Sequence, residues 1–264
     1  MIISITSSIP TFKSVAFQAG LNVLIADKTP TSTERQTRNS AGKTSLIEIV
    51  HFLFGSDCDK DSLFRSNALL AHTFTGSFRL NEGLFTVERG GEEPSRIYLR
   101  ERPENTTLEI KEERATGRSY TSLLAWRAYL GSEFFRLPVD RSGTVFAPSG
   151  TPSYRSLFSY FVRRENAGGF LHPERNSEMQ QRVDWQVNLS YLFRLDWEIP
   201  LAFQKVRDRE KNLAELKKAA KSGALGSVVG TVAELRPKVT IAEKRATTLR
   251  EQLAHFQVDR KSVV

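Results

Sequence analysis

The residues best suited to chemistry lie in one short string, TRNSAGKT, at residues 37–44. A P-loop has the pattern of glycine, four residues, glycine, lysine, and then serine or threonine. Gly42, Lys43 and Thr44 match the end of this pattern, and Thr37 stands where its first glycine would be. In a P-loop, backbone N–H groups and the lysine bind phosphate oxygens, and the hydroxyl group binds Mg²⁺. The string therefore predicts a site for a nucleoside triphosphate and Mg²⁺.

The neighbours of these three residues complete the candidate site. Gly42 lets the backbone approach a phosphate because it has no Cβ atom. The candidates for nucleotide binding are Asn39, Ser40, Ala41, Gly42, Lys43, Thr44 and Ser45, with Lys43 as the catalytic candidate and Thr44 as the Mg²⁺ ligand. A second interpretation stays open, in which Ser40 caps an ordinary helix and Lys43 lies in solvent.

Two elements must position these residues. Residues 21–26, LNVLIA, form a mostly apolar run that predicts a buried strand before the loop. Residues 27–39 are polar and predict a loop. Residues 42–54 carry apolar side chains at helical spacing, and Gly55 follows at the position of a C-terminal capping glycine. This order of strand, loop and helix is the setting that a P-loop requires.

The rest of the N-terminal region predicts a mixture of strands and helices. We expect strands at residues 2–6 and 14–17, and antiparallel strands between residues 72 and 100 with a turn at residues 81–83. Residues 101–119 are highly charged and predict an exposed segment, and helices are expected at residues 122–130 and 154–163.

The C-terminal part carries a narrow apolar seam. From Val228 to Phe256, apolar and small residues alternate by four and three positions, which predicts a coiled coil. An amphipathic helix packed on a globular domain is the alternative. Residues 223–230 are glycine-rich and interrupt the helix, and Pro237 predicts a kink. Because one helix cannot bury such a seam alone, we expect a returning helix or another protein, and hence a fragment or one part of a complex.

The composition is that of a folded protein with a positive net charge. Of the 264 residues, 39% are hydrophobic and 26% are charged, and the formal net charge is +8. This charge favours a nucleic-acid partner, and a generally basic surface is the alternative. No apolar run approaches the roughly 20 residues that span a bilayer, and no signal peptide begins the chain, so we expect a cytoplasmic location without a membrane partner. The one cysteine, Cys58, predicts no disulfide, and the four histidines lack metal-ligand spacing.

The opening of the chain resembles the N-terminal lobe of SMC-like ABC ATPases. The features shared with that lobe are two short strands, the string GLNVLI at residues 20–25, the P-loop and a helix that begins KTSLIE at residue 43. The chain is most similar to uncharacterised bacterial SMC-like proteins, some of them associated with ABC-three-component systems. The strings that carry this similarity lie at residues 39–55, 168–173 and 223–235. In that group the first P-loop glycine is often absent.

The resemblance implies a fold of the α/β (α+β) class. Residues 1–200 would form the N-terminal lobe of an ATPase head with an antiparallel β insertion, and residues 201–264 the start of a coiled-coil arm. A C-terminal lobe would supply the signature, the Walker B segment and a switch histidine, none of which this sequence contains. Two heads would enclose Mg-ATP and act on DNA in repair, chromosome maintenance or phage defence. The expected partners are therefore DNA, a second head or C-terminal lobe, and further subunits.

The resemblance also assigns residues. Lys43 and Thr44 carry over directly, Asn39 and Ser40 are loop positions, and Lys13 is expected to approach the nucleotide. The glutamine with which such enzymes sense Mg²⁺ has no clear match, because residues 163–165 are Arg, Arg and Glu where it would be sought. The chain alone is expected to bind ATP weakly and to hydrolyse little of it.

Two other classes of protein stay open. A P-loop kinase or GTPase that acts on a small substrate would share the same string, and its nucleotide selectivity would distinguish it. A non-enzymatic coiled-coil scaffold would use the string only as a helix cap, and the replacement of Lys43 would then change no nucleotide binding.

Overall fold

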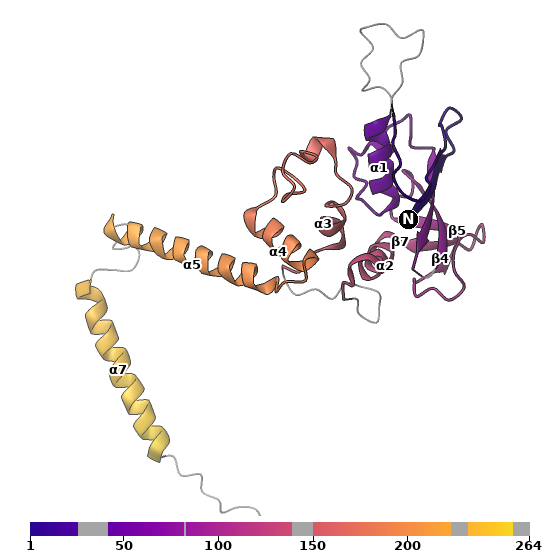
Figure 1. The fold of residues 1–264 in the computed structure, drawn as a ribbon. Coiled ribbons are helices and arrows are strands. Elements are labelled where there is room, and N and C mark those ends of the chain that lie inside the picture. Colours follow the sequence, from indigo (N-terminus) through magenta and orange to yellow (C-terminus); the bar gives the residue numbers. More distant parts are fainter. Residues whose placement is uncertain (26–41, 82, 139–149, 223–231, 256–264) are drawn as a thin grey trace, which may run out of the picture. The chain divides into compact units, whose positions relative to one another are not determined.

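The computed structural model describes residues 1–25, 42–81, 83–138, 150–222 and 232–255. The chain divides into two compact units, Met1–Leu201 and Ala202–Val264. The first unit combines an antiparallel sheet with helices, so the fold is of the α+β class (Figure 1).

The sheet of the first unit has seven strands in the described residues, in the order β2-β1-β3-β4-β5-β7-β6, and all neighbours are antiparallel. The strands are β1 (Ile2–Ser7), β2 (Val15–Ala16), β3 (Thr73–Leu80), β4 (Gly83–Gly90), β5 (Arg96–Glu101), β6 (Lys111–Glu112) and β7 (Ser119–Ser122). The strands expected at residues 2–6, at residues 14–17 and between residues 72 and 100 are confirmed. The segment expected to be exposed, residues 101–119, adds β6 to the sheet and buries Leu108.

The helices follow the apolar patterns of the sequence, with one difference. They are α1 (Lys43–Leu53), η2 (Leu63–Arg65), α2 (Leu123–Phe135), α3 (Tyr154–Phe158), η3 (Glu165–Ala167), α4 (Arg182–Leu192), α5 (Glu198–Lys221) and α7 (Val232–His255). The helix expected at residues 154–163 is wrong beyond Phe158. The Arg163 guanidinium donates there to the carbonyls of Tyr160, Pro173 and Arg175, and these contacts hold a turn in place of a helix.

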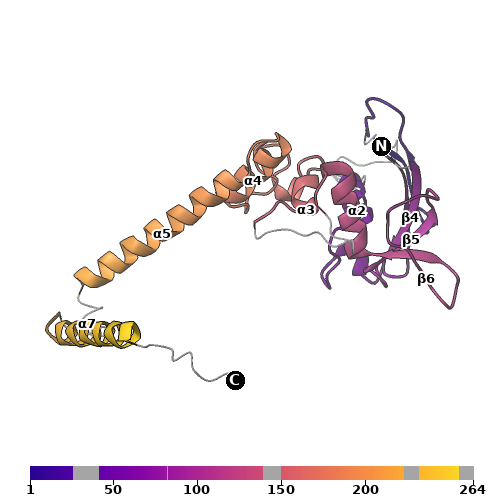
Figure 2. The same ribbon diagram turned by 90° about the horizontal axis from the view of Figure 1, so that it is seen from below.

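Helices α1 and α2 cover one face of the sheet, as both views of the ribbon show (Figures 1 and 2). The alternation of β3 points Phe74, Phe78 and Leu80 into this layer, where all three are buried. Ring contacts join the layers: Phe54 lies 4.5 Å from Phe78, measured between ring centroids. These contacts hold α1 against β3 and β4. The packing of the core therefore determines where Lys43, the first residue of α1, lies.

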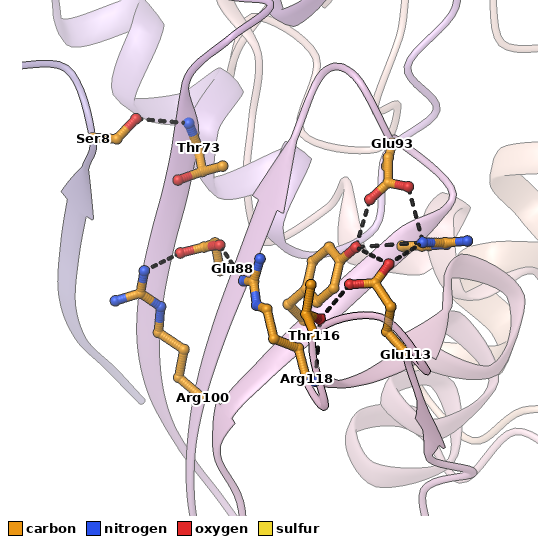
Figure 3. Close-up of polar contacts among 10 residues, drawn as sticks. Ser8, Thr73, Glu88, Glu93, Arg100, Glu113, Thr116 and Arg118 are labelled. Carbon is orange, nitrogen blue, oxygen red and sulfur yellow. Dashed lines mark hydrogen bonds and ion pairs between the residues drawn. The ribbon is translucent and has the colours of Figure 1, made fainter.

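The opposite face of the sheet carries a polar network on β4 and β5 and on the segment that leads into β7 (Figure 3). The Glu88 side chain is only 4% exposed and accepts hydrogen bonds from Arg100 and Arg118. The Arg118 guanidinium also lies 3.9 Å from the centre of the Tyr98 ring. The two guanidinium groups pair with the buried Glu88 carboxylate, so this polar face leaves no unpaired charge on Glu88.

The expected buried strand at residues 21–26 is wrong for its described part. Residues 21–25 have no strand structure, and their four apolar side chains are between 52% and 91% exposed. The Asn22 amide explains the loop, because it accepts the Gln18 N–H (2.9 Å) and donates to the carbonyls of Gln18 and Gly20. The apolar run therefore pairs with no described strand, and the described sheet contains no parallel layer.

The second unit consists in its described part of helical segments. Helix α5 runs into this unit from the end of the first, and α7 continues through Pro237. The apolar side chains of Leu213, Val239 and Leu249 are each more than half exposed. The coiled coil and the kink remain predictions, and Val228 and Phe256 lie outside the described residues. No helix of the described chain is long and apolar enough to cross a membrane.

Candidate nucleotide-binding site

The first turn of α1 is open at its N-terminal end. The helix begins at Lys43, and Gly42 precedes it in the left-handed region with φ 75°. The first helical bond joins the Leu46 N–H to the Gly42 carbonyl (2.9 Å), so the N–H groups of residues 43–45 point out of the helix end. No described side chain caps this end, its first turn holds no acidic residue, and residues 42–45 are all exposed. Such an end carries partial positive charge and favours an anion.

The C-terminal end of α1 is closed by arginine and tryptophan side chains. Arg89 is fully buried and donates to the carbonyls of Phe52 and Ser56. Arg127 donates to the Gly55 carbonyl (2.6 Å), and the Trp126 indole N–H donates to the Leu53 carbonyl (3.0 Å). Gly55 has φ 83°, the left-handed capping conformation that its sequence position predicts. Buried donors thus anchor this end in the core.

One side of α1 contacts the segment that follows α3. The Thr44 hydroxyl donates to the Glu165 carboxylate (3.3 Å), and one turn later Glu48 pairs with Arg164 (2.8 Å). One turn further, the His51 Nε2 lies 2.9 Å from the Val162 carbonyl oxygen. Steps of four and three residues place these three side chains on one helix face. Beside this face lies a cavity of about 400 Å³, lined in part by Glu48, His51 and Arg164.

His51 makes the last of these three contacts along α1, and its ring is uncharged at neutral pH. Burial, together with the charges of Arg164 and Arg155, lowers the pKa of His51 to about 3. The neutral ring donates from Nε2 to the Val162 carbonyl and accepts at Nδ1 from Arg155 (3.1 Å). The spacing of His51 from Thr44, seven residues or two helical turns, is the sequence signal for this role.

The sequence-predicted site residues fall into three groups. Gly42, Lys43, Thr44 and Ser45 lie together at the open helix end. Asn39, Ser40 and Ala41 lie outside the described residues. Lys13 is exposed in the turn between β1 and β2, and its approach to a nucleotide stays a prediction.

Glu165 lies in the segment where the resemblance predicts a metal-sensing glutamine, but no role was predicted for it. The structure brings its carboxylate to the Thr44 hydroxyl. The hydroxyl and the carboxylate both offer oxygen atoms, which are the ligands that Mg²⁺ prefers. Adjacent ligand atoms in an octahedral Mg²⁺ shell lie about 3 Å apart. The pair therefore fits Mg²⁺ as a partial site. No cluster of three or more metal-binding side chains occurs among the described residues, so phosphate and water oxygens would complete the coordination.

Comparison with protein-family models, with curated proteins and with solved structures gives no match for this chain.

Proposed function

We propose that the first unit is the ATP-binding lobe of an SMC-like ABC ATPase head that acts on DNA in the cytoplasm. One observation carries the proposal: α1 presents Gly42, Lys43 and Thr44 at an exposed helix end with no described side-chain cap. A triphosphate would accept from the N–H groups of this end, and Lys43 would neutralise its charge. The net charge of +8 supports the DNA partner.

Thr44 and Glu165 are the proposed protein ligands of Mg²⁺. Bound Mg²⁺ would neutralise negative charge on the β- and γ-phosphates. The ion pair between Arg164 and Glu48 holds the segment that carries Glu165 against α1, so these two residues position the carboxylate. His51 fixes the same segment from the next turn.

The exposed apolar run at residues 21–25 supports an incomplete head. Full burial of one Leu, Val or Ile side chain contributes about 1.5–3 kcal/mol, so four exposed ones favour a covering partner. We propose that a second lobe pairs with this run as a strand and supplies the residues for hydrolysis. The chain alone then binds ATP and turns it over slowly.

Isothermal titration calorimetry tests this function. Mg-ATP is expected to bind the wild-type chain and to bind Lys43→Ala at least about 100-fold more weakly, because the substitution removes a charge-assisted phosphate contact. The circular dichroism spectrum of Lys43→Ala should match the wild type, since Lys43 is exposed. A preference for GTP would favour a P-loop GTPase, and the absence of nucleotide binding by the wild type would favour the scaffold.

Glu165→Gln is the matched variant for the metal. The substitution keeps the size of the side chain and removes its charge, so Mg-ATP binding should weaken by about tenfold. Binding of ATP in the presence of EDTA should stay unchanged. Equal weakening with and without Mg²⁺ would contradict the assignment of Glu165 as a metal ligand.

A further inference from the structure

A second surface feature lies where helices α2 and α4 end, near the C-terminal end of α1, since the Phe134 and Phe54 rings lie 6.1 Å apart between centroids. A cavity of about 470 Å³ opens there, and we call it the aromatic groove. Its lining includes both aromatic rings and cations: Phe134, Phe161, Tyr191, Trp197, Arg136 and Arg194. All of these residues belong to the first unit. The described residues that line the groove include no acidic side chain.

The groove is fixed by contacts between its walls. The Tyr191 hydroxyl donates to the Phe135 carbonyl (3.0 Å) and ties the end of α4 to the end of α2. The Phe135 and Phe161 rings lie 5.8 Å apart between centroids. Phe161 and Phe134 nevertheless remain 65% and 40% exposed. The walls are therefore held in place while aromatic surface stays in solvent.

The two arginines of the groove have an unusual backbone. Arg136 and Arg194 have φ of 54° and 57°, and they are the two non-glycine residues with positive φ in the described part of the chain. Glycine adopts this left-handed conformation at helix ends with less strain. The sequence thus keeps a guanidinium at both strained positions, and strained residues cluster at functional sites. A cation at a helix C-terminus also has a favourable interaction with the helix dipole, which is a structural role distinct from ligand binding.

We propose that the aromatic groove binds single-stranded nucleic acid, with bases stacked on Phe134 and Phe161 and phosphates paired with Arg136 and Arg194. Aromatic rings bordered by cations are the combination that binds single strands without sequence preference. A duplex keeps its base faces stacked and cannot offer them to exposed rings. Two acids adjoin the lining residues in sequence, Glu133 and Asp196, and neither lines the groove. Asp196 accepts the Glu198 N–H (3.0 Å). The groove therefore complements an anion that carries flat aromatic groups.

This inference names the DNA-contact surface of the proposed function, and its test needs no ATP. Failure of ATP binding would leave the groove unaffected, and failure of the groove would leave Lys43 and Thr44 unaffected. Fluorescence anisotropy with a labelled short oligo-dT, without nucleotide, measures binding in the groove alone. It therefore distinguishes a failure of the groove from a failure of ATP binding.

The test uses the double variant Arg136→Gly/Arg194→Gly. Oligo-dT binding should weaken at least about tenfold, and the slope of log K against log salt should fall by roughly 1.4, for two lost phosphate contacts. The melting temperature should stay equal or rise, because glycine relieves the backbone strain. A purely structural role of the arginines predicts the opposite, a lower melting temperature with unchanged binding.

The matched control is Arg102→Ala/Arg114→Ala, which removes two exposed arginines that do not line the groove. The control should lose less than about threefold of the oligo-dT affinity, and Phe161→Ala should lose about tenfold through stacking. Equal losses in control and groove variants, tighter binding of duplex than of single strand, or no binding of oligo-dT by the wild type would each overturn the proposal. It would also be overturned if the groove variants lost self-association in sedimentation and kept oligo-dT binding.

Discussion

The two ends of helix α1 are built in opposite ways. At the C-terminal end, Arg89, Trp126 and Arg127 donate to main-chain carbonyls inside the core. At the N-terminal end, Gly42 and Lys43 are exposed and no described side chain caps the helix. An ordinary stable helix satisfies both ends. The difference shows that buried side chains anchor the C-terminal end, and under the proposed function the N-terminal end binds a triphosphate.

Replacement of Arg89 is expected to have the largest effect. Burial lowers the pKa of Arg89 to about 10, so its guanidinium stays charged at neutral pH. Arg89→Met leaves the carbonyls of Phe52, Ser56 and Pro94 without this donor, and we expect a loss of about 3 kcal/mol or more in the free energy of unfolding. Urea denaturation followed by circular dichroism measures it.

The matched substitution Arg79→Met removes an arginine that is exposed on β3. It should change the free energy of unfolding by less than about 0.5 kcal/mol. If Arg89→Met cost as little as this control, the C-terminal end of α1 would not be the anchor, and the contrast between the ends would disappear.

A smaller effect is expected from acid, through His51 on the side of α1. The pKa of about 3 in the folded state lies below the ordinary histidine pKa of 6.5, so below pH 6.5 the unfolded chain binds a proton that the folded chain does not. Stability is then fully present above pH 6.5 and falls by about 1.4 kcal/mol for each pH unit below it, or about 2 kcal/mol by pH 5.

His51→Gln should remove this part of the slope while it keeps a donor for the Val162 carbonyl. The difference between wild-type and variant stability from pH 7 to pH 5, from denaturation curves, isolates His51 from the carboxylates. Parallel curves for the two proteins would show that His51 titrates normally and that the 162–165 segment does not bury it.

The parts of the fold that depend on local pattern were predictable from the sequence. Gly55 ends α1 as its position indicated, and the alternation of Phe74, Phe78 and Leu80 gave β3 its buried face. The strand predicted at residues 21–26 is wrong in its described part, because an apolar run forms a strand only where a neighbouring strand exists to pair with it. Asn22, within that run, was the sequence signal of the loop that forms instead.

Only the part of the candidate site that lies in one continuous stretch of sequence was predictable. Gly42, Lys43 and Thr44 follow from a motif, and the structure puts them at one helix end. Glu165 lies 121 residues away from Thr44 in sequence, and the contact depends on the path of the chain after α3, which no local pattern encodes. The same holds for Arg136 and Arg194, since the positive φ that they share is a property of the folded backbone.

Hydrogen exchange at the backbone amides of α1 tests the central claim most directly. With saturating Mg-ATP, the amides of Lys43, Thr44 and Ser45 should exchange at least about tenfold more slowly than in the free chain, and the amides of residues 53–56 should not change. Adenosine without phosphates should give no protection at either end. Unchanged exchange at residues 43–45 under saturating Mg-ATP would contradict the account, because the open end of α1 would then hold no triphosphate.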